Sequence, residues 1–377
     1  MKSAGTSFPE IGRFHDDPNQ SYTLPGTYYY DPSVYAAELE AIFSRTWQYV
    51  CHVSRLQAAG DYAVRDIGDQ SVVVLRSADG QLRAYHNVCR HRAHRLLEGS
   101  GQTGTAIVCP YHNWTYRLSG ELLSARHSAE VEDFNVEEFC LHGVRVETFC
   151  GFVFVNLDDD AEPLLQGLEE LEWEIRELSP QLDELKLADY REIPIAANWK
   201  NSVENYSECY HCPNRHPSLA NGSLDMASYQ ITVHDRYHSH ASRGVGEDTA
   251  YGRPMDTHGE AREFGSWLIW PNFVLEVYPG GYLNSFYHLP VAVEQTIQVC
   301  EWYFPSEQPT VTQQEVIDFV DGVRDEDIPI CESVQKGLHS KGYTQGRFIA
   351  NSERSYFSEH AVHDFQKRVI RALGMWD

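Results

Sequence analysis

Two short segments of the sequence each place a thiol close to an imidazole. They are Cys89-Arg90-His91 and Cys109-Pro110-Tyr111-His112, with residues 92–108 between them. Two cysteines and two histidines on facing loops could hold a tetrahedral zinc ion, although the commonest zinc fingers supply both cysteines first. One Cys and one His from each loop suits a 2Fe-2S cluster, with the thiolates on one iron and the imidazoles on the other. We therefore predict an electron relay here, easier to reduce than an all-cysteine cluster because two neutral ligands replace two anions.

A second group of possible metal ligands lies in residues 198–216, NWKNSVENYSECYHCPNRH. We expect a helix here, on which Glu208 and His211 are i,i+3 neighbours whose side chains can meet. His216 lies five residues after His211 and would point roughly 140° away on an ideal helix. Because Pro213 breaks a helix, we expect the chain to curl there and bring both imidazoles to one ion.

Two imidazoles suit iron, zinc, copper or nickel, and a carboxylate as third ligand would leave open positions for O₂ on Fe(II). A predicted late helix offers Asp325, Glu326 and Asp327 for this role. An acid at that place could also be a solvated residue that the helix dipole favours.

Three other residues of the same segment have two interpretations each. Cys209 and Cys212 form a C-x-x-C pair that could be a redox or zinc motif. We expect packing thiols instead, because His211 and His216 already explain the segment. Glu204 is either an outer partner of a metal ligand or an ordinary helix acid.

The elements that must position these residues fall into two regions. Short alternating and β-branched runs between residues 51 and 157 predict a small antiparallel β domain that carries the first two loops. Helical spacing covers residues 34–50, with Ser33 as a cap. An acidic segment, residues 158–184, predicts a linker and an exposed helix. Beyond it we expect a helix at 198–210, strands at 267–289 and 297–304, and a long helix at 313–340. The fold class is therefore α+β.

The composition excludes several classes of function. The 377 residues include 55 acidic and 30 basic side chains, a net charge of −25, which argues against a nucleic-acid partner. We see no apolar run of membrane-spanning length and no signal peptide, so we expect a cytoplasmic protein with no membrane contact. The nine cysteines are odd in number and scattered, unlike a secreted disulfide framework.

The first two segments resemble the ligand loops of the Rieske oxygenases, which typically read C-x-H-R-G and C-P-Y-H-x-W. Here they read CRHRA and CPYHNW, with Ala93 and Asn113 where the family often has Gly. The resemblance implies that Cys89, His91, Cys109 and His112 hold the cluster. It also selects Asp327 as the third ligand of a mononuclear iron, beside His211 and His216.

The same resemblance implies a domain plan and a reaction. An arm and helix (1–45) would pack on a catalytic domain (159–377) of the helix-grip type, an antiparallel sheet flanked by helices, with the Rieske domain over 46–158. NADH electrons would arrive through a flavin and ferredoxin-type 2Fe-2S reductase. The iron would use O₂ to oxidise a small-molecule substrate. In a homotrimer, Glu208 would bridge His112 of one subunit to His211 of its neighbour.

Glu208 within ENYSECYHC, with WLIWPN, CESVQKGL and SEHAVHDFQ, resembles the group acting on carnitine, glycine betaine and stachydrine. This resemblance implies monooxygenation of a quaternary ammonium compound, such as carnitine, γ-butyrobetaine or glycine betaine, with C–N cleavage or N-demethylation. Residues 267–287 are rich in aromatic side chains, which attract such cations. From this stretch we select Trp267, Trp270, Phe273, Glu276 and Tyr278 as substrate residues. The alternative is an aromatic core with Glu276 pointing outward.

Rival functions remain open at this point. They are a hydroxylase of an aromatic ring or aromatic acid, a Rieske electron carrier without catalytic iron, and a zinc protein. Basic side chains outnumber acidic ones in residues 86–117, which contain one acid, Glu98, and four arginines, Arg90, Arg92, Arg95 and Arg117. We expect an acidic reductase to dock on this basic patch, at a rate that falls as salt rises.

Overall fold

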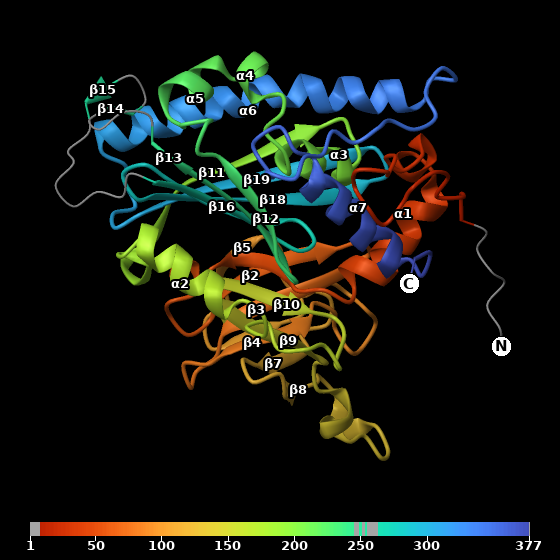
Figure 1. The fold of residues 1–377 in the computed structure, drawn as a ribbon. Coiled ribbons are helices and arrows are strands. Elements are labelled where there is room, and N and C mark those ends of the chain that lie inside the picture. Colours follow the sequence, from red (N-terminus) through yellow and green to blue (C-terminus); the bar gives the residue numbers. More distant parts are fainter. Residues whose placement is uncertain (1–7, 245–248, 251–252, 255–262, 377) are drawn as a thin grey trace. The chain divides into compact units, whose positions relative to one another are not determined.

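A computed structural model of the protein describes residues 8–244, 249–250, 253–254 and 263–376 (Figure 1). The chain forms two compact units, Phe43–Gln166 and a second unit made of Met1–Ile42 with Gly167–Asp377. The first unit thus extends beyond the expected range 46–158 at both ends. The first seven residues of the expected arm lie outside the described part.

The unit Phe43–Gln166 is an antiparallel β structure, as predicted. Its larger sheet has the order β1-β10-β9-β4-β3-β2-β5, and a second sheet has the order β6-β7-β8. The strands of the larger sheet are β1 (Gln48–His52), β2 (Asp61–Ile67), β3 (Gln70–Arg76), β4 (Leu82–His86), β5 (Ser100–Gln102), β9 (Gly143–Phe149) and β10 (Phe152–Asn156). The small sheet contains β6 (Ala106–Val108), β7 (Thr115–Arg117) and β8 (Leu122–Ser124). The loops after β4 and β6 carry the two Cys/His segments.

The second unit is an antiparallel sheet flanked by helices, which confirms the α+β prediction. Its seven-stranded sheet has the order β11-β19-β18-β17-β16-β13-β12. The strands are β11 (Lys186–Ile195), β12 (Gln230–Val233), β13 (Tyr237–Arg243), β16 (Glu263–Ile269), β17 (Phe273–Tyr278), β18 (Tyr282–Ala292) and β19 (Gln295–Phe304), and a separate hairpin pairs β14 (Thr249–Ala250) with β15 (Arg253–Pro254). The helices are α1 (Pro32–Glu38), α2 (Glu169–Leu178), α3 (Trp199–Tyr206), α4 (Cys212–Arg215), α5 (Pro217–Gly222), α6 (Val311–Leu338) and α7 (His360–Ala372).

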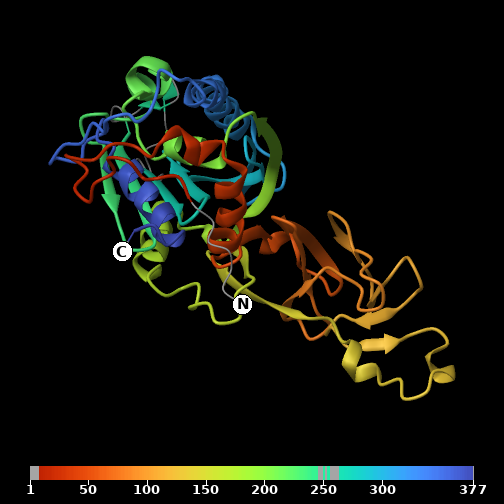
Figure 2. The ribbon, with the colours of Figure 1, turned by 90° about the vertical axis from the view of Figure 1, so that its right-hand side faces the viewer.

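The two faces of this sheet have different partners. Figures 1 and 2 both show α6 lying along one face, next to α4 and α5. On the other face the indole of Trp267 donates a hydrogen bond to Glu174 of α2 at 2.7 Å. In β16 and β17, Ser266 pairs with Glu276, and Trp267 pairs with Leu275. Since neighbouring residues of a strand point to opposite faces, Ser266 and Glu276 lie on the α6 side.

The predicted helix over residues 34–50 is wrong in its second half. Helix α1 begins after Asp31, whose carboxylate accepts from the Ser33 amide, so Asp31 and not Ser33 is the cap. The helix continues through a π-helical turn, Leu39–Phe43, and the chain then enters strand β1 at Gln48. All five residues of β1 are buried. Their burial in a sheet, which depends on partners distant in sequence, outweighs the local helical spacing. No helix in the described ranges is long and apolar enough to cross a membrane.

Candidate metal centres and the cavity beside them

The two Cys/His loops of the first unit close in the same way. In each loop the cysteine amide donates to the carbonyl five residues later, His94 or Trp114, at 2.8 Å. The amide four residues after each cysteine, that of Ala93 or Asn113, donates back to the cysteine carbonyl at 3.0 Å. Both Ala93 and Asn113 have positive φ, 55° and 59°. These are the two positions where the family often has Gly, so the loops keep the left-handed turn although Ala93 strains it by about 1 kcal/mol.

The four side chains of these loops converge. Cys89 and Cys109 are 3% and 1% exposed, whereas both histidines lie at the surface, with their Nδ1 atoms 3.1 Å apart. The Tyr116 hydroxyl lies 3.3 Å from the Cys89 sulfur, and the ring of His91 stacks on Trp114. Two buried thiols behind two outward imidazoles fit the donor set of a 2Fe-2S cluster with its histidine-bound iron at the surface.

The second group of candidates lies where α3 ends. The predicted helix over 198–210 stops at Tyr206, and α4 begins at Cys212 with Pro213 in its first turn. Pro213 therefore starts a helix where we had expected it to break one, since Pro is tolerated at the first helical positions. The expected contact between Glu208 and His211 does form, but within a loop, where Glu208 Oε1 lies 2.6 Å from His211 Nδ1.

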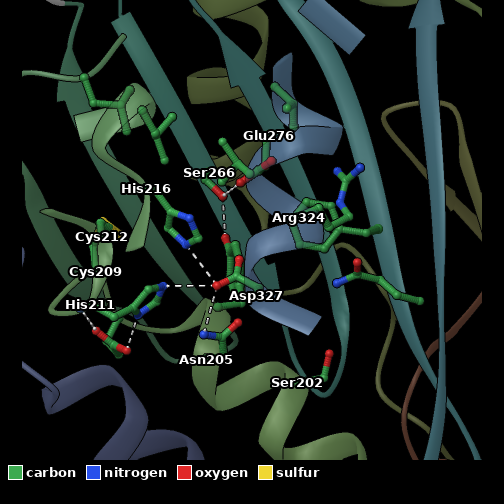
Figure 3. Close-up of a pocket in the computed structure, with 18 of the residues that line it drawn as sticks. Ser202, Asn205, Cys209, His211, Cys212, His216, Ser266, Glu276, Arg324 and Asp327 are labelled. Carbon is green, nitrogen blue, oxygen red and sulfur yellow. Dashed lines mark hydrogen bonds and ion pairs between the residues drawn. A yellow bond between two sulfur atoms is a disulfide. The ribbon is translucent and has the colours of Figure 1, made fainter. Parts of the chain in front are cut away.

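His211, His216 and Asp327 come together as expected (Figure 3). Their potential ligand atoms all lie within 4.8 Å of one another. Asp327 Oδ1 is 2.9 Å from His216 Nε2 and 3.4 Å from His211 Nε2. The amide of Asn205 donates to the same oxygen at 3.3 Å. One carboxylate oxygen and two Nε2 atoms thus face a common point, the arrangement of a 2-His-1-carboxylate iron site.

Outer carboxylates fix both imidazoles. His211 Nδ1 contacts Glu208, and His216 Nδ1 lies 2.7 Å from Glu326 Oε2. Such partners orient metal-binding histidines and increase their basicity. Burial lowers the pKa of His211, but Asp327 and Glu208 outweigh it and raise that pKa to about 10. Asp327 and Glu208 thus place two carboxylates against His211, a negative surrounding that suits a divalent cation. Sequence reasoning named Glu326 only as an alternative ligand and missed this outer role.

A cavity adjoins this group of ligands, and only part of the predicted substrate set lines it. Glu276 and Tyr278 line the cavity. Glu276 is 5% exposed and accepts a hydrogen bond from the Ser266 hydroxyl at 3.1 Å, so the outward alternative is wrong. Burial raises the pKa of Glu276 to about 7, although Arg324 opposes this shift. The other aromatic residues of the lining are Tyr206, Tyr229, Phe264 and Phe286. Phe286 lies in the predicted aromatic stretch but was not selected, and the other three lie outside that stretch.

Trp267, Trp270 and Phe273 do not line this cavity. Trp267 lies on the α2 face of the sheet, and Trp270 packs against Phe365 of α7. Side chains along β16 and β17 alternate between the two faces of the sheet. Phe264 and Ser266 therefore point to the cavity face, and Trp267 points to the other face. Counting aromatic residues along the chain, without assigning faces, led to the wrong choice.

Cys209 and Cys212 form a disulfide, so the expectation of two packing thiols is wrong. The Cys212 amide donates to the Cys209 carbonyl at 3.1 Å, and this tight turn brings the two Cα atoms to 5.0 Å. Glu204 accepts a hydrogen bond from the Tyr29 hydroxyl at 2.7 Å. In the described ranges it has no bond to either metal-facing histidine.

The basic patch near the first centre is smaller than the sequence count implied. Arg95 pairs with Asp66 at 2.5 Å and with Glu98 at 3.3 Å. Arg117 lies 3.5 Å from Glu121. Arg90 donates to the carbonyl of Cys140. Both Asp66 and Glu121 lie outside the counted window. Glu121 is only four residues after Arg117, whereas folding brings Asp66 to Arg95 from 29 residues away.

Comparison with known proteins matches both units to families. Residues 182–375 match the ring hydroxylating alpha subunit (catalytic domain), and residues 46–135 match the Rieske [2Fe-2S] domain. The carnitine monooxygenase oxygenase subunit of Escherichia coli K12 is 38% identical over 376 residues, covering 99% of this chain and 100% of that protein. The glycine betaine monooxygenase oxygenase subunit of Chromohalobacter salexigens is 30% identical, covering 91% of this chain and 84% of that one.

A solved structure agrees with these sequence matches. The quaternary ammonium Rieske monooxygenase CntA in complex with L-carnitine has a TM-score of 0.86 and 35% identity, covering 97% of this chain and 99% of that one. Naphthalene 1,2-dioxygenase from Rhodococcus, at 19% identity and a TM-score of 0.77, shares the fold. This chain therefore belongs to the Rieske non-haem iron oxygenases, as an α subunit with a Rieske 2Fe-2S cluster, a mononuclear iron and monooxygenase activity.

Proposed function

We propose that the protein is the terminal oxygenase of a two-component system that hydroxylates a quaternary ammonium compound at the iron held by His211, His216 and Asp327. The substrate is carnitine, γ-butyrobetaine, glycine betaine or a close analogue. The hydroxylated carbon lies next to the nitrogen or on an N-methyl group. The C–N bond of the hydroxylated product then breaks. Cleavage at the chain carbon releases a smaller amine and an aldehyde, and cleavage at an N-methyl group releases formaldehyde and a demethylated amine.

One observation carries this proposal: the cavity beside the three iron ligands contains a buried carboxylate, Glu276, among aromatic side chains. A quaternary ammonium group has no N–H donor, so a protein binds it through negative charge and the faces of aromatic rings. Tyr206, Tyr229 and Phe286 supply rings in the same cavity. A neutral aromatic substrate would leave the charge of Glu276 buried without a counter-charge from the substrate, which is unfavourable.

The overall reaction consumes O₂, two electrons and two protons for each C–H bond hydroxylated, and the second oxygen atom leaves as water. When bound, the cluster supplies single electrons and the iron activates O₂. Asn205 and Glu326 hold Asp327 and His216 in position. The aromatic rings exclude water and orient the substrate's methyl groups. Cys89, His91, Cys109 and His112 hold the cluster.

We assign the transfer of electrons to Glu208 and to a homotrimer. Glu208 accepts from His211 within its own chain, and its side chain is 14% exposed, at the edge of the site. In this proposal, His112 of the neighbouring subunit contacts the exposed part of Glu208, which completes the path from cluster to iron. A solved structure of a quaternary ammonium Rieske monooxygenase, described as giving insight into inter-subunit electron transfer, is similar over 97% of this chain.

The electron donor is a reductase with flavin and a ferredoxin-type 2Fe-2S domain, which takes its electrons from NADH. We place its docking site near Arg90 and Arg92 at the cluster, and give Arg95 a lesser part because Asp66 and Glu98 neutralise it. We expect the reduction rate to fall as salt rises and to fall further in Arg92→Glu. The control is Arg117→Glu, since Arg117 already pairs with Glu121.

A substrate panel tests the proposed function. The purified protein is incubated with reductase, NADH and O₂ in the presence of carnitine, γ-butyrobetaine, glycine betaine, stachydrine or benzoate. We expect an amine and an aldehyde from at least one ammonium compound. Turnover of benzoate alone would show an aromatic hydroxylase instead. About two irons per chain with no turnover would favour an electron carrier without catalytic iron.

A further inference from the structure

The cavity contains a second buried charge that iron binding does not use. Arg324 lines the cavity together with Glu276, and it is 6% exposed. It lies on α6 three residues before Asp327, so both side chains point to the same face of the helix. The helix rise separates their backbone positions by about 4.5 Å along the axis. A cation thus lies one turn of helix from an iron ligand.

Arg324 and Glu276 are neighbours without a direct ion pair. With its amide nitrogen facing the carboxylate, Asn284 donates to Glu276 Oε2 at 3.2 Å and accepts from Arg324 Nη2 at 3.3 Å. Arg324 Nη1 donates to Asp321 Oδ1 at 2.7 Å, and its guanidinium carbon lies 5.1 Å from the centre of the Phe286 ring. Figure 3 shows Glu276 and Arg324 close together on one side of the site, away from His211. The cavity wall therefore has a positive and a negative pole.

Two separated buried charges are costly unless something balances each of them. Asp321 compensates Arg324 only in part, because Asp321 also pairs with Arg191 on its other side. A ligand that has one positive and one negative group would balance both poles at once. The guanidinium group matches a carboxylate by charge and by its planar donors.

We propose that Arg324 binds the carboxylate of a zwitterionic substrate while Glu276 and the aromatic rings hold its ammonium group. Arg324 is then a specificity-determining residue, and the enzyme selects carboxylated ammonium compounds over a plain cation such as choline. The inference rests on the proposed function and specifies the substrate class.

The first test uses the unaltered protein with both metal centres loaded. Calorimetry compares the binding of γ-butyrobetaine with that of its methyl ester and of choline, which keep the ammonium group and lose the carboxylate. We expect both to bind roughly 10- to 100-fold more weakly than γ-butyrobetaine, the loss of one charge-assisted contact. Equal binding of all three compounds would overturn the inference and leave the proposed function standing. No binding of any ammonium compound would instead count against the proposed function.

The second test compares two variants. Arg324→Gln should weaken γ-butyrobetaine roughly 10- to 100-fold and change choline by less than about threefold, mainly through KM. Arg191→Gln is the matched control, because Arg191 contacts the same Asp321 but does not line the cavity. It should leave the preference unchanged. An equal loss for both ligands in Arg324→Gln would show a purely structural role. If Arg324→Gln fails to fold, Arg324→Lys should keep the preference for γ-butyrobetaine at reduced affinity, and loss of that preference would contradict the inference.

Discussion

Glu208 makes two contacts with His211, the iron-facing histidine that a bridging acid must reach within its own chain. Its Oε1 contacts His211 Nδ1, and its Oε2 accepts from the His211 amide at 3.3 Å. We expect Glu208→Gln to keep both metal centres and to slow electron transfer to the mononuclear iron at least about tenfold, the low end of effects for outer partners. Rapid mixing of the reduced protein with O₂ and substrate measures this rate from the visible absorption of the cluster.

Glu326→Gln is the matched control for that variant. Glu326 also contacts an iron-facing imidazole, at His216, but it has no part in the proposed path. With the iron site loaded, we expect the cluster of Glu326→Gln to be reoxidised much faster than that of Glu208→Gln, because only Glu208 lies on the proposed path. Equal slowing in both variants would mean that Glu208 acts only by orienting its histidine.

Glu276 makes substrate binding depend on pH. Burial raises its pKa to about 7, with Arg324 opposing the shift. The nearby Tyr206 and Tyr229 have pKa values above their ordinary range and stay neutral. As pH rises from 6 to 8, Glu276 ionises, so choline should bind up to about tenfold more tightly. Calorimetry at several pH values measures this, and Glu276→Gln should remove the dependence. The same slope in the variant would assign the effect to another group.

Several residues of the site follow from the sequence, and the exceptions have a physical cause. Cys89, Cys109 and their histidines are local motifs, so spacing alone groups them. Asp327 lies more than one hundred residues after His211 in the sequence, so spacing could not group them and only the resemblance selected it. Glu276 lies between Leu275 and Val277 in an apolar strand, and the sequence alone does not show which face of the sheet it points to. Its hydrogen bond with its strand partner Ser266, beside the cavity, shows the correct face.

At the scale of elements, a buried ion pair joins α1 to α3. Glu38 and Lys200 are both 0% exposed, with Oε1 and Nζ 2.6 Å apart. The Trp199 indole donates to the other oxygen of Glu38 at 2.9 Å. Since α3 leads directly into the loop that carries Glu208 and His211, this pair anchors the base of the iron site.

We expect Glu38→Gln to lower the free energy of unfolding by about 3–5 kcal/mol, because it leaves the Lys200 ammonium buried without its partner. Urea titration followed by fluorescence, with both metal centres loaded, measures this loss. Glu40→Gln is the control, since Glu40 is an exposed acid two residues away. A loss below about 1 kcal/mol would mean that Lys200 finds another partner.

The class and arrangement of the elements could be predicted better than their ends. Period-two alternation and Gly-rich turns indicated the β unit, and the late amphipathic segment is the long helix α6. The ends of α1 and α3 could not be predicted, because the sheet partners of β1 and the turn closed by the Cys209–Cys212 disulfide decide them. Local propensity cannot represent such contacts.

At the scale of the whole molecule, the proposed path joins centres on different subunits. A variant without a cluster, His91→Ala, and a variant without mononuclear iron, Asp327→Ala, should each be inactive alone. Oligomers assembled from both chains together should regain measurable activity, because the cluster of one subunit supplies the iron of its neighbour. Chains mixed only after assembly provide the control. No recovery in co-assembled oligomers would indicate transfer within one chain.

A single-turnover experiment tests the central claim most directly. The protein is reduced chemically, freed of reductant, and mixed with O₂ and γ-butyrobetaine, and the amine products are measured by mass spectrometry. We expect trimethylamine, or a demethylated amine with formaldehyde, at a yield near one per iron site. We expect none from Asp327→Ala, which should keep its cluster spectrum. An unaltered protein that oxidises no quaternary ammonium compound, or an Asp327→Ala variant with equal yield, would contradict the assignment.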